Sequence, residues 1–307
     1  MSEELMRELQ ALVTEGRNPV SERLDAMSTR EILETMNRED AKVTAAVAKV
    51  IPEIEKAVEL IVAAFRSGGR LFYIGAGTSG RLGVLDAAEC PPTFGTDPEL
   101  VQGFIAGGYG ALVRAVEGAE DDSTGSHDFF KQQGLCEKDC VCGIAASKRT
   151  PFVRGGLEFA KTQGARTILV TCNPPSATDG GLDVVIAPIV GPEVLTGSTR
   201  MKAGTATKLV LNMLTTASMV RMGKCYGNLM VDLRATSDKL RERVRAMLML
   251  LTKVEYAEAE RLVAAADGEL KTAIVMQVCG IGAAEARTRL AAAKGQIRRV
   301  IGERFLP

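Results

Sequence analysis

Apolar residues recur at helical spacing through the first part of the chain. Ser28 and Glu31 form a capping-box pattern in front of one apolar stripe, and a second stripe follows Ile51-Pro52. Ser67-Gly68-Gly69 then ends the second helix. The pattern predicts an N-terminal helical segment over residues 1–66.

Beyond residue 66, short apolar runs alternate with helical patterns. Strands are expected at 71–74, 101–105, 141–145, 167–171 and 184–187, and helices at 79–89, 110–117, 151–163 and 200–222. Most of the strands are near-continuous apolar runs rather than alternating ones, which is typical of parallel strands covered on both faces. This alternation predicts an α/β fold with a doubly wound parallel sheet of five strands, in a domain that spans residues 67–224.

After residue 225 the strand pattern stops. Helices are expected at 236–254, 256–265, 270–277 and 283–292. Asp267-Gly268 and Gly280-Ile281-Gly282 separate the last three of them. Residues 225–307 are therefore expected to form a small C-terminal helical region.

The first predicted strand ends in the glycine-rich loop Gly75-Ala76-Gly77-Thr78-Ser79-Gly80, where a helical pattern begins. Exposed backbone N–H groups and the positive end of the helix dipole make such a junction an anion site. The glycine spacing matches the dinucleotide-binding fingerprint, but the second strand ends in Ala106-Gly107-Gly108, without the acidic residue that would hold a ribose. A Walker A motif is also excluded, because Arg81 stands where lysine is required. The loop alone therefore indicates an anion site without identifying the ligand.

Two further strand ends carry hydroxyl residues at the start of a helix. Ser147 and Thr150 follow the third strand, and Thr196, Ser198 and Thr199 follow the fifth. One such loop alone would be ordinary helix capping. Because parallel strands end at the same edge of a sheet, three such loops would form a compact cradle with many hydroxyl partners. This arrangement favours a phosphorylated polyol, such as a sugar phosphate, over a flat nucleotide.

Composition excludes several other classes. Lysine plus arginine equals aspartate plus glutamate at 38 each, and tryptophan is absent, so neither phosphate-backbone binding nor base stacking is expected to be the main function. The acidic start has no signal-peptide core, and no apolar run is long enough to span a membrane. The seven cysteines, of which Cys136, Cys140 and Cys142 cluster without C-x-x-C spacing, are expected to be reduced thiols rather than metal ligands. We therefore expect a cytoplasmic protein that holds no metal and binds neither nucleic acid nor membrane.

Five motifs carry a family resemblance. They are residues 75–83 (GAGTSGRLG), 88–93 (AECPPT), 116–121 (VEGAED), 197–206 (GSTRMKAGTA) and 208–214 (KLVLNML). They resemble the N-acetylmuramic acid 6-phosphate etherases, which are built on the sugar isomerase (SIS) fold, and the resemblance runs from Thr14 to the C-terminal helices. It implies cleavage of the lactyl ether of the sugar phosphate into D-lactate and N-acetylglucosamine 6-phosphate. It also implies a homodimer, a role in cell-wall recycling, and catalysis without a metal or organic cofactor.

The chemistry of such a reaction requires acid–base groups. An ether oxygen is a poor leaving group, so direct displacement is difficult. Once the sugar ring opens, C1 becomes an aldehyde and the C2 proton becomes acidic. A base can then remove that proton, an acid can help the C3 oxygen to leave as lactate, and water adds to the alkene. The single histidine, His127, lies in an acidic polar segment and is expected on a surface loop, so carboxylates must act instead.

Matched to the family's motifs, Glu89 and Glu120 are the acid–base pair. Glu89 precedes Cys90-Pro91-Pro92, where the helix is expected to stop, and Glu120 follows the next helix. The resemblance implies that Glu89 protonates the lactyl oxygen. Glu120 would act in proton transfer at C2 or in the activation of water.

Substrate contacts carry over to the three loops. The resemblance places them at Thr78, Ser79, Gly80, Ser147, Thr150, Glu193, Ser198 and Lys202. Arg81 and Arg200 have a structural alternative, in which they hold loops through backbone carbonyls. One departure is Lys148, which replaces the glycine of the family's usual Ser-Gly-x-Thr-Pro loop. Its side chain could crowd the loop, or its ammonium could contact an anionic group of the substrate.

Two alternative functions stay open. One is a non-catalytic regulator that senses a sugar phosphate, since a glucokinase-regulating protein is similar to the etherases. Such a regulator needs an effector surface or a DNA-binding domain. The other is an aldose–ketose sugar phosphate isomerase, which would remove the same C2 proton but release no lactate.

Overall fold

The computed structural model describes residues 12–176, 179, 181–232 and 238–302. The chain divides into two compact units. We call the first the sheet unit, which consists of Met1–Ala88 and Glu99–Thr215. The second, the helical unit, consists of Glu89–Pro98 and Thr216–Pro307.

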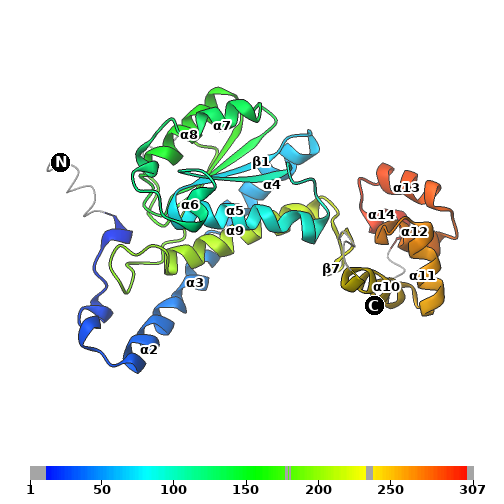
Figure 1. Ribbon diagram of the computed structural model, residues 1–307, viewed down its shortest axis with the longest axis horizontal. Coiled ribbons are helices and arrows are strands. Elements are labelled where there is room, and N and C mark those ends of the chain that lie inside the picture. Colours follow the sequence, from blue (N-terminus) through cyan, green and yellow to red (C-terminus); the bar gives the residue numbers. More distant parts are fainter. Residues whose placement is uncertain (1–11, 177–178, 180, 233–237, 303–307) are drawn as a thin grey trace. The chain divides into compact units, whose positions relative to one another are not determined.

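Five parallel strands form the centre of the sheet unit in the order β2-β1-β3-β4-β5 (Figure 1). They are β1 (Leu71–Gly75), β2 (Val101–Ile105), β3 (Cys140–Ile144), β4 (Arg166–Val170) and β5 (Val184–Ile186). Every residue of β1 and β3 is buried, as expected for parallel strands covered on both faces. The predicted doubly wound sheet is confirmed, and each strand lies within one residue of its predicted bounds.

Two helices, α7 (His127–Gln132) and α8 (Pro151–Thr162), cover one face of the sheet (Figure 1). Phe72 of β1, Phe130 of α7 and Phe152 of α8 belong to one buried apolar cluster on this face. Burial of these aromatic side chains stabilises the packing of helix on sheet.

On the opposite face lie α5 (Gly77–Phe94) and α9 (Lys202–Arg221) (Figure 1). The buried carboxylate of Asp86 in α5 accepts hydrogen bonds from Asn212 Nδ2 at 2.8 Å and Thr215 Oγ1 at 3.3 Å, both in α9. Burial raises the pKa of Asp86, and the hydrogen bonds oppose that rise. The two helices that begin at the first and third loops are thus joined by a buried polar contact.

The N-terminal helices belong to the sheet unit. They are α2 (Thr29–Asp40), α3 (Lys42–Ala48) and α4 (Ile51–Arg66), preceded by the short turns η1 (Val13–Glu15), η2 (Pro19–Ser21) and η3 (Leu24–Ala26). The predicted capping box of Ser28 and Glu31 is present at the start of α2. Helix α4 packs against β1, β3 and β5, whereas α2 extends away from the sheet (Figure 1). The helical prediction for residues 1–11 lies outside the described residues.

Helix α5 is longer than the expected helix 79–89, because it continues through Pro91 and Pro92 to Phe94. The expectation that these prolines end the helix is therefore wrong. Each proline removes one N–H donor, but both lie near the end of the helix, where Gly95 N still donates to Pro91 O at 2.9 Å. Cys90 and Phe94 are buried one turn apart, and their apolar contacts stabilise the last turn.

The segment between β2 and β3 also differs from the prediction. Helix α6 (Gly110–Val113) is shorter than expected and is followed by the turn η4 (Ala119–Asp121). His127 is half-buried at the start of α7, and its ring stacks on Phe159 with the centroids 4.6 Å apart. The assignment of His127 to a surface loop is therefore wrong. The acidic residues next to His127 in the sequence give no indication of its contact with Phe159, which lies 32 residues away.

The helical unit contains a hairpin of β6 (Cys225–Tyr226) and β7 (Leu229–Met230), which the sequence did not predict. Its helices are α10 (Asp238–Thr252), α11 (Tyr256–Ala265), α12 (Leu270–Cys279), α13 (Ala283–Ala292) and α14 (Ile297–Ile301). Helices α11 and α13 have their predicted bounds, α12 extends further, and α14 was not expected. Residues 236–237 of the expected helix 236–254 lie outside the described residues. Within the described ranges, no helix is long and apolar enough to cross a membrane.

Candidate active site

The first loop joins β1 to α5 through a close backbone approach. A Cβ added to Gly80 would lie 2.6 Å from the carbonyl oxygen of Gly75, and Gly77 has a φ of +55°. Glycine is required at the first of these positions and favoured at the second. Thr78 and Ser79 occupy the first turn of α5 and are half-buried. Their N–H groups and hydroxyls therefore lie where the helix dipole favours an anion.

Glu120 lies on the same cavity as this loop. The cavity has a volume of about 200 Å³ and is lined by Ala76, Gly77, Arg81, Ala106, Ala111 and residues 115–120. Glu120 itself is exposed, in the turn η4. The fold thus brings a predicted acid–base group to the predicted anion site.

Arg81 fixes the wall of this cavity. Its Nε donates to Leu112 O at 3.0 Å and its Nη2 to Ala111 O at 2.6 Å. Both acceptors are backbone carbonyls of α6, so Arg81 has the structural role that the sequence left open.

The second loop follows β3 and carries Ser147 and Thr150. Thr150 is the N-cap residue of α8, but its hydroxyl makes no capping hydrogen bond. The backbone carbonyl of Thr150 instead accepts from Val153 N at 3.0 Å, with Pro151 at the first helical position. Helix capping, the alternative to substrate binding, therefore does not occupy the hydroxyl of Thr150.

Lys148 adopts a φ of +68° in the second loop, a left-handed conformation that favours glycine. Its Nζ donates to Pro174 O at 2.8 Å and lies 3.5 Å from Asp179 Oδ2. The lysine thus adopts the backbone conformation expected of the family's glycine. Its ammonium is held by the segment that follows β4.

The third loop precedes α9, and the side chain of Glu193 at its beginning bonds to the backbone at its end. The carboxylate of Glu193 accepts hydrogen bonds from Lys202 N at 3.0 Å and Ala203 N at 2.8 Å, so it caps the N-terminus of α9. Burial raises the pKa of Glu193, and the two N–H donors oppose that rise. Because Glu193 is the cap, the hydroxyl of Ser198 is not needed for this purpose.

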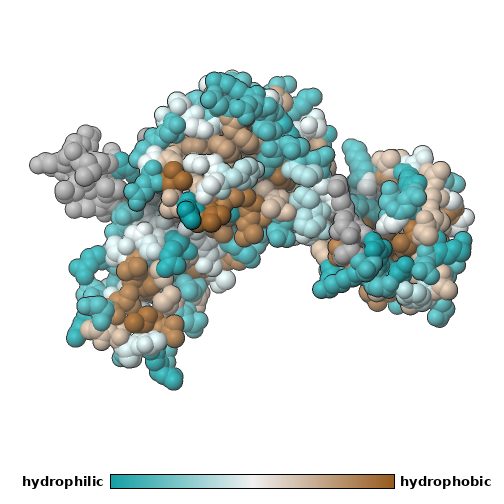
Figure 2. All heavy atoms as spheres, in the orientation of Figure 1, coloured by the Kyte–Doolittle hydropathy of each residue, from teal (hydrophilic) through white to brown (hydrophobic). Residues whose placement is uncertain are grey.

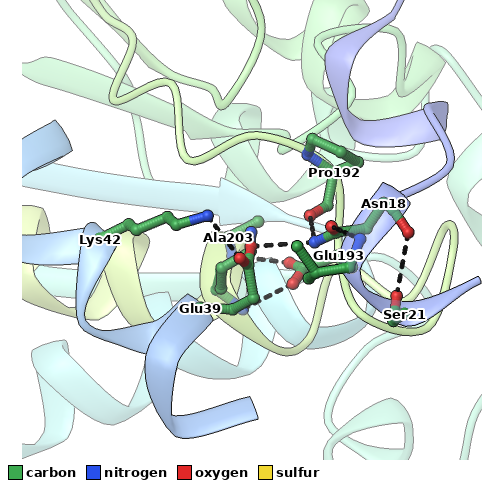
Figure 3. A network of polar contacts seen from close by, with 9 residues as sticks. Asn18, Ser21, Glu39, Lys42, Pro192, Glu193 and Ala203 are labelled. Atoms are coloured by element: carbon green, nitrogen blue, oxygen red, sulfur yellow. Dashed lines mark hydrogen bonds and ion pairs between the residues drawn. The ribbon is translucent and has the colours of Figure 1, made fainter. Parts of the chain in front are cut away.

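Lys202 is buried and paired with a carboxylate from α2. Its Nζ lies 2.6 Å from Oε2 of Glu39, and the same oxygen accepts from Asn18 Nδ2 at 2.9 Å. The other oxygen, Oε1, accepts from the ammonium of Lys42. Figure 3 shows this arrangement, in which α2, the N-terminal segment and the third loop meet. We call Asn18, Glu39, Lys42, Glu193 and Lys202 the Glu39 cluster. Within it, Glu39 neutralises the ammonium that the sequence assigned to substrate binding.

Acid is expected to weaken the fold through Glu39. Burial raises the pKa of Glu39, but hydrogen bonds from Lys202, Lys42 and Asn18 outweigh it and lower the pKa from 4.5 to about 2. A carboxylate with a lowered folded pKa stabilises the fold above pH 4.5 and loses that contribution as the pH falls toward 2. The stability advantage of the wild type over Glu39→Gln should therefore shrink by about 2 kcal/mol between pH 6 and pH 3. Urea unfolding of both proteins measures it, and an advantage that is independent of pH would contradict the expectation.

The N-terminal segment joins the second and third loops, a role that the sequence analysis missed. Val13 N donates to Asn173 Oδ1 at 2.7 Å, and Asn173 Nδ2 donates to Ala146 O at 2.9 Å. Asn18 Nδ2 donates to Pro192 O at 3.0 Å. The available signal was the motif Thr14–Asn18, which contributed to the resemblance but was given no place in the site.

The first and third loops are also neighbours. A Cβ added to Gly204 in the first turn of α9 would lie 3.5 Å from Thr78 Cγ2 and 3.5 Å from Thr199 O. Together with the contacts through Asn173 and Asn18, this places all three predicted loops at the carboxyl edge of the sheet.

Glu89 is exposed on α5, at the first residue of the part of this helix that belongs to the helical unit. Its catalytic role stays a prediction. The roles predicted for Glu120 and for the eight substrate-binding residues also stay predictions.

The cysteines of the chain are all free, and each is buried or half-buried. Burial raises the pKa of the Cys140 and Cys142 thiols, which disfavours the thiolate needed to bind a metal. Among the described residues, no group of three or more His, Cys, Asp or Glu side chains is placed to hold a metal ion.

Solved structures with a similar fold include two phosphoheptose isomerases. The enzyme from Neisseria gonorrhoeae is 15% identical with a TM-score of 0.49, over 62% of this chain and 98% of that chain. The enzyme from Francisella tularensis is 14% identical with a TM-score of 0.46, over 62% of this chain and 100% of that chain. Residues 53–161 match the family of the glucokinase regulatory protein N-terminal SIS domain.

Sequence relatives are more similar and span nearly the full length. The N-acetylmuramic acid 6-phosphate etherase of Salinibacter ruber is 54% identical over 98% of this chain and 97% of its own. The etherase of Mycolicibacterium smegmatis is 54% identical over 96% of this chain and 99% of its own. The etherase of Photorhabdus laumondii is 52% identical over 95% of this chain and 97% of its own. On the strength of this identity, the chain belongs to the N-acetylmuramic acid 6-phosphate etherase family.

Proposed function

We propose that this chain cleaves the lactyl ether of N-acetylmuramic acid 6-phosphate, giving N-acetylglucosamine 6-phosphate and D-lactate in cell-wall sugar recycling. The observation that carries the proposal is identity above 50% with etherases over nearly the whole chain. The three loops at the carboxyl edge of the sheet support it, because they offer a helix N-terminus for a phosphate and hydroxyls for a sugar.

The reaction proceeds by elimination and hydration. With the ring open, Glu120 takes the C2 proton, Glu89 donates a proton to the C3 oxygen, and D-lactate leaves. Glu89 then takes a proton from water as the hydroxyl adds at C3, and Glu120 gives its proton back to C2, so that N-acetylglucosamine 6-phosphate forms and both carboxyl groups regain their starting state. The place of Glu120 beside the first loop supports its part, since the phosphate would bind there. Each proton transfer of this kind typically contributes about 10²–10⁴-fold to the rate.

Substrate contacts fall into three groups. Thr78, Ser79 and Gly80 would hold the phosphate, together with Ser147 and Thr150, whose loop lies at the same edge of the sheet. Ser198 would contact the sugar from the third loop. Glu193 and Lys202 would support substrate binding by holding the third loop in place, because both are buried and bonded to protein groups.

The release of D-lactate from N-acetylmuramic acid 6-phosphate tests the proposal. We expect stoichiometric D-lactate and N-acetylglucosamine 6-phosphate from the purified protein. An isomerase would give a ketose phosphate without lactate, and a sensor would bind the sugar phosphate without turnover. Either of these results would overturn the proposed reaction.

We infer a homodimer, which the family resemblance implies. Exposed apolar residues support it: Tyr109 and Val113, at α6, are 73% and 86% exposed, and Val116 follows them. Figure 2 shows hydrophobic residues gathered over this part of the sheet unit. Contiguous apolar surface of this kind often marks an interaction site. Light scattering after size exclusion measures the mass in solution.

We also infer a cytoplasmic location. The seven free cysteines support it, because reducing compartments keep thiols unpaired. Cell fractionation followed by immunodetection tests this inference.

Lys148→Gly is expected to change the KM for the sugar phosphate while lactate release persists. The replacement removes a left-handed lysine and its contacts with Pro174 and Asp179, so the second loop gains freedom. Lys148→Met is the matched control, since it keeps the strained backbone but loses the ammonium. Steady-state kinetics of both variants give the result. A KM of Lys148→Gly equal to that of the wild type would contradict this expectation.

A further inference from the structure

Asn18 and Glu39, two members of the Glu39 cluster that lie outside the third loop, contact groups at its two ends. Glu193 and Lys202 are the first and last residues of the segment that carries Ser198, and the bond from Lys202 N to the Glu193 carboxylate joins these ends. The segment between them is tightly turned, with Ser198 N donating to Leu195 O at 3.0 Å and Met201 N to Ser198 O at 3.2 Å. The conformation of the loop therefore depends on what holds its two ends.

Lys202, at the end of the third loop, has its ammonium group in an electrostatically unfavourable position. It is the first residue of α9, where the positive end of the helix dipole repels a cation, and its side chain is only 2% exposed. A buried ammonium is costly unless a carboxylate compensates it. Glu39, itself 5% exposed, is the carboxylate in contact with it.

The ammonium of Lys202 is bonded to a carboxylate outside the loop. It bonds to Glu39 of α2, and a Cβ added to Gly191, two residues before the loop, would lie 4.0 Å from it. Asn18 adds a second connection, because its Nδ2 donates both to Glu39 Oε2 and to Pro192 O. Glu39 is thus bonded directly to Lys202 at one end of the loop and connected through Asn18 to Pro192, just before the other end.

We propose that Glu39 is a positioning residue for the sugar phosphate: through Lys202 and Asn18 it holds the 193–202 loop in the conformation that binds substrate. The inference rests on the proposed function, since it takes the 193–202 loop as part of the substrate site. It gives the N-terminal helix α2 a part in substrate binding, although α2 extends away from the sheet that carries the site. Because the loop binds rather than reacts, a loosened loop raises KM more than it lowers kcat.

Steady-state kinetics of Glu39→Gln and Glu39→Asp test this, with Glu34→Gln as the matched control. Glu34 lies on the same helix, is exposed, and pairs only loosely with Arg30, at 3.9 Å. We expect Glu39→Gln to raise KM at least tenfold, which corresponds to ~1.4 kcal/mol of lost binding, with kcat within about threefold of the wild type. Glu39→Asp keeps the charge and should fall between Glu39→Gln and the wild type, and Glu34→Gln should match the wild type.

The outcomes separate this inference from the proposed reaction. A wild type that releases no lactate overturns the reaction itself. An active wild type beside a folded Glu39→Gln with unchanged KM overturns only the positioning role. A fall in kcat at unchanged KM indicates fewer folded molecules, and it also overturns the positioning role. If Glu39→Gln does not fold, Glu39→Asp decides, because a folded Glu39→Asp with the wild-type KM also overturns the inference.

Discussion

Glu89→Gln is expected to reduce D-lactate release by about 10²–10⁴-fold, the usual contribution of a positioned general acid. Glutamine has nearly the same shape as glutamic acid but cannot give a proton to the departing C3 oxygen. Removal of the C2 proton does not require that acid. The variant should therefore still exchange the C2 proton of N-acetylmuramic acid 6-phosphate with deuterium from D2O while it releases almost no lactate. Enzymatic detection of D-lactate and NMR at C2 give the two rates.

Glu137→Gln is the matched control for this experiment. Glu137 is equally an exposed glutamate, but it precedes β3 and so lies at the opposite edge of the sheet from the three loops. It should release lactate at the wild-type rate. Full lactate release by a folded Glu89→Gln would remove Glu89 from the mechanism. Loss of both lactate release and deuterium exchange would show that Glu89 acts at an earlier step than the one proposed.

The sheet and its loops could be predicted because their signals are local. Continuous apolar runs such as 71–74 and 184–187 mark the parallel strands, and glycines with hydroxyl residues mark the turns that follow. In a parallel sheet, adjacency at the carboxyl edge then follows from topology alone. The close approach of Gly80 to Gly75 is a direct consequence of this local pattern.

The Glu39 cluster could not be predicted, because its members are distant in sequence. Glu39 lies in the polar run Asn37-Arg38-Glu39-Asp40, which is typical of a solvated helix end. Its partner Lys202 lies 163 residues away, so no local pattern connects them. Lys202 was assigned to the substrate through the family motif, and the structure adds a protein carboxylate at its ammonium. His127 and Phe159 were missed for the same reason.

Glu120 has the second large expected effect. Glu120→Gln should lose both D-lactate release and deuterium exchange at C2, each by about 10²–10⁴-fold, because an amide cannot take the C2 proton. The paired result with Glu89→Gln, which loses only lactate release, would order the two proton transfers. Both rates come from the D2O and lactate measurements described for Glu89.

Glu117→Gln tests whether this role belongs to Glu120 itself. Glu117 lines the same cavity beside the first loop and is also exposed, so the two glutamates differ in position but not in chemistry. If Glu117→Gln abolishes exchange while Glu120→Gln retains it, the base has been assigned to the wrong carboxylate. If Glu120→Gln instead releases lactate and accumulates the unsaturated aldehyde, proton removal at C2 is intact and the addition of water is blocked. Glu120 would then activate water, and another group near the cavity would remove the C2 proton.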